Sequence, residues 1–284
     1  MTMERVGVIG GGLMGSGIAE VCARAGSQVV VHEIDTPAAE AAVARIESSL
    51  AKAVERGKLE EAARSELLER ITVSTDLDEQ SDRQLVIEAA TENEELKRKI
   101  FTDLDMIVTD EEAILASNTS SIPITRLAAA TGRPENVVGL HFFNPVPVMA
   151  LVELVTTVMT SDIAAGRARA YAETLGKTVI LAKDRAGFVV NMLLVPYMLS
   201  AIRMLETGVA SAEDIDTGMR LGANHPMGPL ELTDFVGLDT TKFVADVLFD
   251  EFKEPLYASP PLLTRMVEAG LHGRKSGGGF YSYR

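Results

Sequence analysis

A histidine and a glutamate in apolar surroundings are the residues of this chain with the clearest chemical potential. His141 lies in a strand-like apolar run, and Glu153 lies in the next one, Leu151 to Val155. Histidine can take a proton from an alcohol near neutral pH, and a carboxylate at its other ring nitrogen would fix the tautomer. Because a buried carboxylate needs a partner, the pattern predicts that Glu153 pairs with His141. A core histidine and a solvent-facing glutamate are the alternatives that these residues leave open.

Further polar residues stand where a sheet does not itself require them. The run Asn118 to Ser121, which contains Ser120, follows one expected strand, and Asn144 follows the strand of His141. Ligands of open α/β sheets bind at the carboxyl ends of the strands, so these side chains are candidate ligand contacts. Asn191, a single amide on an apolar helix, is either buried structure or a polar anchor for a ligand.

A glycine-rich turn near the start of the chain predicts a dinucleotide site. A buried strand runs through Gly10, Gly12 and Gly15 into an apolar helix. The first glycine allows the tight turn, the second admits a pyrophosphate, and the third lets the helix pack on the strand. The next strand, Gln28 to Val31, runs into Glu33, whose carboxylate suits ribose hydroxyls and repels a ribose phosphate. The pattern therefore favours NAD over NADP, with a flexible turn and a solvated acid as the plainer alternatives.

Alternating strand and helix patterns predict the fold class and the domains. Strands are expected at 71–74, 85–89, 113–117, 137–143, 151–157 and 178–181, with helices at about 94–108, 124–130 and 163–175. Thr36 and Pro37 read as the N-cap and first residue of another helix, which stops at Gly57. Beyond Phe188 only helical spacing appears, and Ser211 has the spacing of a helix cap. We expect an α/β protein, with a Rossmann-type, mostly parallel sheet domain over residues 1–184 and an all-α domain over 185–284.

Composition limits the partners and surroundings of the protein. Its 284 residues are 46% hydrophobic and carry a formal net charge of −14, which suits two folded domains and argues against binding nucleic acid. The single cysteine, Cys22, rules out an internal disulfide and should serve packing. The most apolar stretch, Phe188 to Leu205, contains Pro196 and Arg203, so a buried helix is expected there and not a membrane span. We expect a soluble, cytoplasmic protein.

An anionic ligand would need local positive charge on so acidic a chain. Lys52, Arg56 and Lys58 lie close together in sequence, and Lys97 to Lys99 form a second basic group. On the sequence alone, solvated helix faces explain both groups better than a ligand site does. A histidine base and a bound dinucleotide need no metal ion between them, and none is expected.

Seven separated motifs resemble those of the short-chain L-3-hydroxyacyl-CoA dehydrogenases, and together they span nearly the whole chain. The most specific is the run His-Phe-Phe-Asn-Pro at 141–145, and the others cover 8–15, 88–90, 116–121, 187–191, 222–229 and 273–277. The resemblance implies an NAD-dependent oxidoreductase that interconverts (S)-3-hydroxyacyl-CoA and 3-oxoacyl-CoA. The resemblance is in particular to the bacterial members that act on 3-hydroxybutyryl-CoA.

The resemblance also implies residue roles and an assembly. It makes His141 the general base, Glu153 the residue that orients it, and Ser120 and Asn191 the groups that hold the substrate at its reacting oxygen. The implied NAD contacts are Gly10, Gly12, Gly15, Glu33, Glu92, Lys97, Ser120, Asn144 and Lys275. The helix that carries Ser49 and Arg56 is expected to meet the CoA moiety, and a homodimer is expected to form through the C-terminal domain.

Other functions would share parts of this pattern. A 3-hydroxyadipyl-CoA dehydrogenase of phenylacetate breakdown would share all of these features. Dehydrogenases of the 3-hydroxyisobutyrate or 6-phosphogluconate kind use a lysine base on the interdomain helix, and no lysine stands between Phe188 and Leu205. A non-catalytic NAD-binding relative is possible on the same fold, but it would not need His141, Glu153 and Ser120 together.

Overall fold

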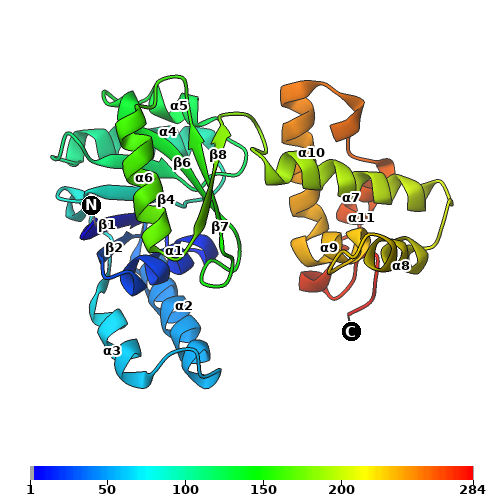
Figure 1. The fold of residues 1–284 in the computed structure, drawn as a ribbon, viewed down its shortest axis with the longest axis horizontal. Coiled ribbons are helices and arrows are strands. Elements are labelled where there is room, and N and C mark those ends of the chain that lie inside the picture. The colour runs from blue at the N-terminus through cyan, green and yellow to red at the C-terminus, as the bar shows by residue number, and fades with distance from the viewer. Residues whose placement is uncertain (1–2, 284) are drawn as a thin grey trace. The chain divides into compact units, whose positions relative to one another are not determined.

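The computed structural model describes residues 3–283, which form two compact units that meet in sequence between Arg185 and Ala186. We call these unit 1 and unit 2. Unit 1 contains a sheet flanked by helices, and unit 2 is built from helices (Figure 1). This architecture confirms the predicted fold class.

Unit 1 is built on an eight-stranded sheet in the order β3-β2-β1-β4-β5-β6-β7-β8. The strands are β1 Arg5–Ile9, β2 Gln28–His32, β3 Ile71–Ser74, β4 Leu85–Glu88, β5 Ile114–Ser117, β6 Val137–Phe142, β7 Leu151–Thr156 and β8 Thr178–Lys183. β7 runs antiparallel to β6, whereas the other neighbouring pairs run parallel. Strands β4, β5 and β6 are buried along their whole length, as expected of a sheet covered on both faces.

The helices of unit 1 are α1 Leu13–Arg24, α2 Thr36–Glu55, α3 Glu61–Glu69, α4 Glu94–Ile107, α5 Ile124–Ala128 and α6 Asp162–Thr174. The predicted cap of α2 is wrong by one residue, because Thr36 is already helical. Asp35 is extended, and its carboxylate accepts a hydrogen bond from the backbone N–H of Ala38 at 2.8 Å. Gly57 ends this region with a φ of 65°, as predicted.

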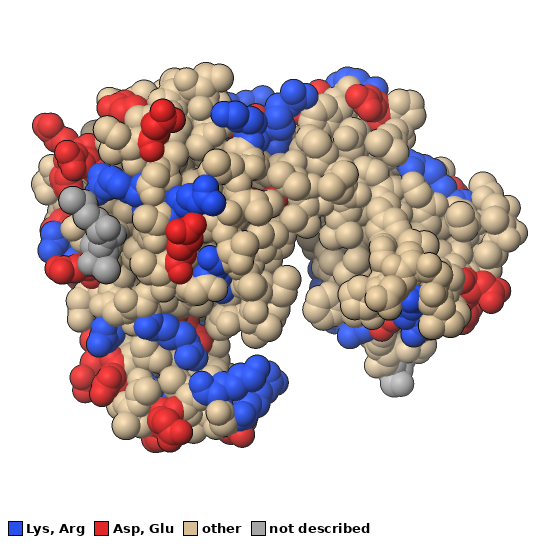
Figure 2. Space-filling model, in the orientation of Figure 1, with Lys and Arg blue, Asp and Glu red and all other residues tan. Residues whose placement is uncertain are grey.

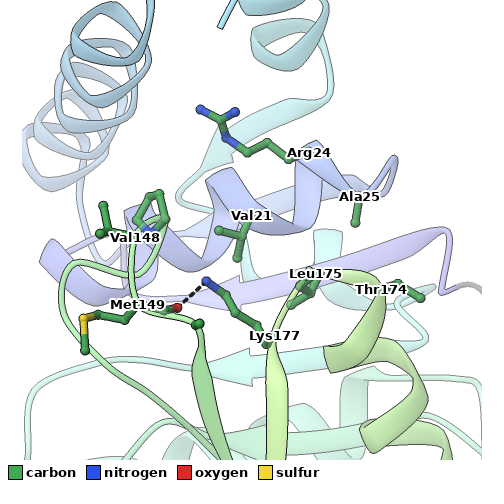
Figure 3. A pocket seen from close by; sticks show the side chains of 11 residues that line it. Val21, Arg24, Ala25, Val148, Met149, Thr174, Leu175 and Lys177 are labelled. Atoms are coloured by element: carbon green, nitrogen blue, oxygen red, sulfur yellow. Dashed lines mark hydrogen bonds between the residues drawn. The ribbon is translucent and has the colours of Figure 1, made fainter. Parts of the chain in front are cut away.

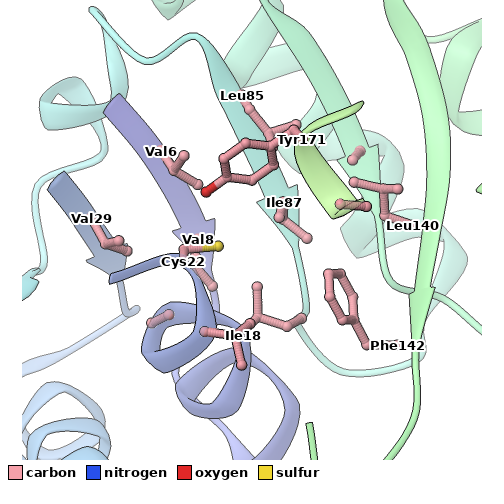
Figure 4. Packing of buried hydrophobic residues seen from close by; sticks show 14 of the residues in the cluster. Val6, Val8, Ile18, Cys22, Val29, Leu85, Ile87, Leu140, Phe142 and Tyr171 are labelled. Atoms are coloured by element: carbon pink, nitrogen blue, oxygen red, sulfur yellow. The ribbon is translucent and has the colours of Figure 1, made fainter. Parts of the chain in front are cut away.

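The core of unit 1 lies between the sheet and its helices (Figure 4). Val6 on β1 and Ile18 on α1 are fully buried within it. Cys22 is also fully buried, which confirms its predicted packing role. Nearby, the Tyr171 hydroxyl and the Ser27 hydroxyl lie 2.9 Å apart, so this buried polar pair is satisfied.

Unit 2 contains α7 Val190–Glu206, α8 Ala212–Gly222, α9 Pro229–Val236, α10 Leu238–Phe252 and α11 Pro261–Glu268. Ser211 caps α8 by accepting from the backbone N–H of Asp214 at 3.1 Å, as its spacing predicts. Leu199, Ile202 and Leu248 are among the fully buried side chains of its core. Over residues 3–283, none of the helices combines the length and apolarity that crossing a bilayer demands.

Candidate functional site

His141 and Glu153 lie directly opposite each other in the pairing of β6 with β7. Nδ1 of His141 is 2.6 Å from Oε2 of Glu153, so the predicted pairing is confirmed. The two residues are 7% and 0% exposed, respectively. A carboxylate at Nδ1 favours the tautomer that carries its hydrogen there, which makes Nε2 the ring nitrogen able to accept a proton. The pair therefore has the chemistry of an oriented general base.

The glycine turn between β1 and α1 has the shape that a dinucleotide diphosphate requires. Gly10 has a φ of 91°, and a Cβ on Gly15 would lie 1.7 Å from the carbonyl oxygen of Gly10, so neither position accepts a side chain. A Cβ on Gly12, by contrast, would meet nothing within 4 Å, because this residue faces open space at the start of α1. A methyl group there would fill the place where a phosphate approaches the helix N-terminus. These residues fit NAD.

Glu33 lies beside this turn. Its Oε1 accepts a hydrogen bond from the backbone N–H of Gly11 at 2.6 Å. The carbonyl of the same glycine accepts from the Ser16 hydroxyl at 2.6 Å and from Nη1 of Arg45 at 3.2 Å. Both the N–H and the carbonyl group of Gly11 are thus hydrogen-bonded, and the carboxylate expected to meet a ribose is held next to the phosphate turn.

The segment after β5, which carries Ser120, is held by Glu92. Oε1 of Glu92 accepts from the backbone N–H of Ser120 at 3.0 Å, from the Ser121 hydroxyl at 2.8 Å and from the Thr119 hydroxyl. Burial alone would raise the pKa of Glu92, but Lys97 and these hydrogen bonds lower it below its ordinary value. Two of the predicted site residues are therefore brought together: the carboxylate of Glu92 holds the loop that carries Ser120.

The segment after β5 is also hydrogen-bonded to β6, the strand that carries His141. Oδ1 of Asn118 accepts from the backbone N–H of Phe142 at 2.9 Å, one residue beyond His141. Because β5 and β6 are parallel neighbours, their carboxyl ends lie at one edge of the sheet. Ser120 and His141 are thus placed at the same edge, as the sequence predicts.

Lys97 is 1% exposed, so the prediction of a solvated face for residues 97–99 is wrong at this position. Its Nζ lies 2.5 Å from Oε1 of Glu88 and 3.4 Å from Oε2 of Glu92. Sequence analysis missed Glu88, a fully buried acid at the end of β4. The signal that identified Glu153, an acid in an apolar run, was present there too. Lys99 does point to solvent and pairs with Asp103.

A cavity of about 490 Å³ lies between α1, α2 and the segment that follows β6. Asn144, Arg45, Ser49 and Lys52 are among the residues that line it. Arg56 stands at the C-cap of α2 and is outside this lining. Basic and acidic side chains are interspersed over the α2–α3 end of unit 1 (Figure 2), so this surface is of mixed charge.

A buried lysine fixes the chain beyond Asn144 (Figure 3). Nζ of Lys177 donates to the carbonyl of Val146 at 2.5 Å and to that of Met149 at 2.8 Å, beside a cavity of about 290 Å³. Lys177 is 8% exposed, and burial lowers the pKa of its ammonium group. Sequence analysis missed this residue because its partners are backbone carbonyls far away along the chain, which no local pattern reveals.

Two predicted site residues belong to unit 2. Asn191 is the second residue of α7. Lys275 lies in the short 3-10 turn Arg274–Ser276, with its Nζ 2.6 Å from Oδ1 of Asp239. The chain that follows is anchored by Asp234, whose carboxylate accepts from the backbone N–H groups of residues 280 and 281 at 2.9 Å each. The role of Asn191 at the reacting oxygen and that of Lys275 as an NAD contact stay predictions.

Comparison with protein families matches each unit separately. Residues 5–185 match the family described as "3-hydroxyacyl-CoA dehydrogenase, NAD binding domain". Residues 187–283 match "3-hydroxyacyl-CoA dehydrogenase, C-terminal domain". The first of these matches identifies NAD as the cofactor, in agreement with the shape of the glycine turn and with the acid at position 33.

Individual relatives match over the full chain. A 3-hydroxybutyryl-CoA dehydrogenase of Mycobacterium tuberculosis is 58% identical over 99% of both chains. One from Bradyrhizobium diazoefficiens is 47% identical over 99% of this chain and 96% of its own. Among solved structures, M. tuberculosis FadB2 has a TM-score of 0.98 at 57% identity, covering 100% of both chains. The (S)-3-hydroxybutyryl-CoA dehydrogenase PaaH1 of Ralstonia eutropha has a TM-score of 0.95 at 48% identity, again over 100% of both chains.

Proposed function

The chain belongs to the 3-hydroxyacyl-CoA dehydrogenase family, and from this premise we propose that it interconverts (S)-3-hydroxybutyryl-CoA and acetoacetyl-CoA with NAD. The observation that carries the proposal is the buried contact of 2.6 Å between His141 and Glu153. An alcohol oxidation needs a base at the hydroxyl, and this pair is an oriented base at the carboxyl edge of the sheet.

In the oxidative direction His141 takes the proton from the 3-hydroxyl group while the hydrogen on C3 leaves with its electron pair. Bound NAD supplies the acceptor for that hydride, and NADH supplies the donor for the reverse reaction. The imidazolium that forms is stabilised by Glu153. In the reductive direction His141 returns the proton to the oxygen, so that atoms and charge balance.

Ser120 and Asn191 are proposed to donate hydrogen bonds to the reacting oxygen as its charge changes. The hold of Glu92 on the backbone of Ser120, at 3.0 Å, supports this role for the serine. For Asn191 the support is its place in the Gly-Phe-Val-Val-Asn motif of the resemblance. Both side chains would act as positioned donors, not as nucleophiles.

The residues that would hold NAD are the turn of Gly10, Gly12 and Gly15 for the diphosphate and Glu33 for the adenine ribose. The open face of Gly12 supports the first assignment. Further contacts are proposed from Glu92, Lys97, Ser120, Asn144 and Lys275. For Lys97, whose ammonium group is buried between Glu88 and Glu92, we propose that the contact runs through Glu92.

The CoA moiety is proposed to meet α2, through Ser49 in the cavity of about 490 Å³ and through Arg56 at the end of the helix. The guanidinium group of Arg56 can meet a phosphate group. We also propose a homodimer formed through unit 2 and a cytoplasmic location, both of which rest on the resemblance.

The test is a kinetic assay of the purified chain with acetoacetyl-CoA and NADH, followed by the loss of NADH absorbance. We expect turnover by the wild type, and for His141→Gln a retained affinity for NADH with a loss of most turnover. Near-normal turnover by His141→Gln would eliminate the base assignment. NADH binding without consumption would favour a non-catalytic relative.

Substrate preference is tested by comparing acetoacetyl-CoA with longer 3-oxoacyl-CoA thioesters and with 3-oxoadipyl-CoA. The proposal expects the highest kcat/KM with acetoacetyl-CoA. A higher kcat/KM with the carboxylated thioester would instead assign the enzyme to 3-hydroxyadipyl-CoA.

A further inference from the structure

Glu88 is a buried carboxylate that the proposed reaction does not use. It is 0% exposed at the end of β4, where β1 and β5 flank it. Its oxygens accept from Nζ of Lys97 at 2.5 Å, from the backbone N–H of Ala90 at 2.7 Å and from the Ser117 hydroxyl at 2.6 Å. A buried acid with three donors is costly to place and is held in a single geometry.

The contacts of Glu88 continue to the loop of the proposed substrate serine. Lys97 also lies 3.4 Å from Oε2 of Glu92, while the other oxygen of Glu92 accepts from the backbone N–H of Ser120 at 3.0 Å. One ammonium group thus stands between two carboxylates, closer to the first than to the second.

We propose that Glu88 is a positioning residue for the reaction, because it retains Lys97 and thereby leaves Glu92 free to hold the backbone of Ser120. The inference rests on the proposed function for its kinetic consequence. Glu88 has no contact with the reacting atoms in this scheme and acts only through its neighbours.

The substitution Glu88→Gln removes the carboxylate charge that retains Lys97. The amide is neutral and would turn an N–H group toward either Lys97 or Ser117, where the wild type has acceptor oxygens. Lys97 would then pair with the remaining carboxylate, Glu92, and draw it away from Ser120. Because Lys97 lies at Oε2 of Glu92 and the loop donates to Oε1, a closer ion pair at Oε2 would move the carboxylate toward Lys97 and lengthen the hydrogen bonds to the loop.

Hydrogen exchange measures this effect without any assay of activity. In Glu88→Gln we expect the amides of residues 119–122 to exchange about tenfold faster than in the wild type, with the rest of unit 1 unchanged. The matched control is Asp105→Asn on the same helix, α4, where the carboxylate pairs with Arg133 at 2.8 Å. Its amides at 119–122 should exchange at the wild-type rate. Unchanged exchange of this loop in folded Glu88→Gln overturns the proposal.

Kinetics then separate positioning from general destabilisation. We expect Glu88→Gln to lower kcat by about tenfold in the wild-type background and by less than about twofold when Ser120→Ala is already present. Equal reductions in both backgrounds would show that Glu88 does not act through Ser120, and would overturn the proposal. If the wild type turns over no 3-oxoacyl-CoA, the proposed function fails, while the exchange result still decides the role of Glu88.

A second variant covers the case in which Glu88→Gln does not fold. The double change Glu88→Gln with Lys97→Met replaces the buried ion pair with neutral side chains of similar size, an exchange that proteins often tolerate. Because Lys97 is then absent and no ammonium group draws Glu92 away from Ser120, residues 119–122 should keep wild-type protection. Loss of protection in this variant would show that Glu88 does not act through Lys97 and Glu92, and would overturn the proposal.

Discussion

The substitution Glu153→Gln tests the physical basis of the proposed base. In the wild type the carboxylate is fully buried and lies 2.6 Å from Nδ1 of His141. Glutamine has nearly the same shape and can still form a hydrogen bond to the ring. The change therefore removes a negative charge and leaves the packing intact.

The size of the effect follows from the charge that forms during the reaction. When His141 accepts a proton, its positive charge is centred roughly 4 Å from the carboxylate charge, and two unit charges at that distance interact by about 4 kcal/mol at an effective dielectric constant of about 20. The amide dipole of glutamine replaces part of this. We expect the barrier to rise by about 3 to 4 kcal/mol, which lowers kcat by roughly a hundredfold to a thousandfold.

The assay is steady-state oxidation of (S)-3-hydroxybutyryl-CoA with NAD, the direction in which His141 accepts the proton, together with NADH titration and thermal unfolding of each variant. Affinity for NADH and melting temperature should stay near the wild-type values. The matched control is Glu173→Gln, where an exposed glutamate pairs with Arg169 on the surface of α6 and activity should not change. A folded Glu153→Gln enzyme with kcat within about threefold of the wild type would refute the electrostatic reasoning.

Three further predictions concern the glycine turn, the thiol and the acid of the serine loop. Gly12→Ala should leave the melting temperature unchanged yet weaken NADH binding at least about tenfold in a fluorescence titration, since its methyl group enters open space; Gly15→Ala should also lower the free energy of unfolding in urea, by about 1 to 3 kcal/mol, because its methyl group meets the Gly10 carbonyl. Burial raises the pKa of Cys22 to about 12, so Ellman's reagent should modify it only after denaturation, and rapid labelling of the native protein would contradict this. Although burial opposes it, Lys97 and the loop hydrogen bonds lower the pKa of Glu92 in the native state. The wild type should therefore be more stable than Glu92→Gln above the ordinary glutamate pKa, and this advantage should disappear as pH falls through the lowered pKa. Urea unfolding at decreasing pH measures it, and a difference in unfolding free energy that does not change with pH would refute the prediction.

Much of the site could be predicted from the sequence because its signals are local. The order of strand, glycines, helix and acid over Val6 to Glu33 specifies the dinucleotide turn, since each glycine answers a steric demand in a short segment. The pairing of Glu153 with His141 follows from a more general argument, that an acid in an apolar strand must find a partner. In both cases the residues that interact lie on the same element or on consecutive elements of the chain.

Other features escaped prediction because their local sequence signals are weak or misleading. Lys97 on α4 is buried against Glu88 at the end of the preceding strand, β4, but the polar sequence around Lys97 resembles an ordinary solvated helix. The sequence pattern does not predict helix α3, since Leu67 is its one buried residue and its apolar periodicity is weak. The cap at Asp35 shows a smaller error of one residue, within the usual uncertainty of helix ends.

The antiparallel pairing of β6 with β7 has a consequence for how the chain can vary. Side chains alternate between the faces of a strand, so a shift of one residue in this pairing would turn Glu153 away from His141 to the opposite face of the sheet. Residues 143–150 connect the two strands, and a single insertion or deletion that shifted the register could separate the acid from the imidazole without altering either one. The length of this connection is therefore more tightly constrained than its composition. The chain should accept changed side chains there more readily than a changed number of residues.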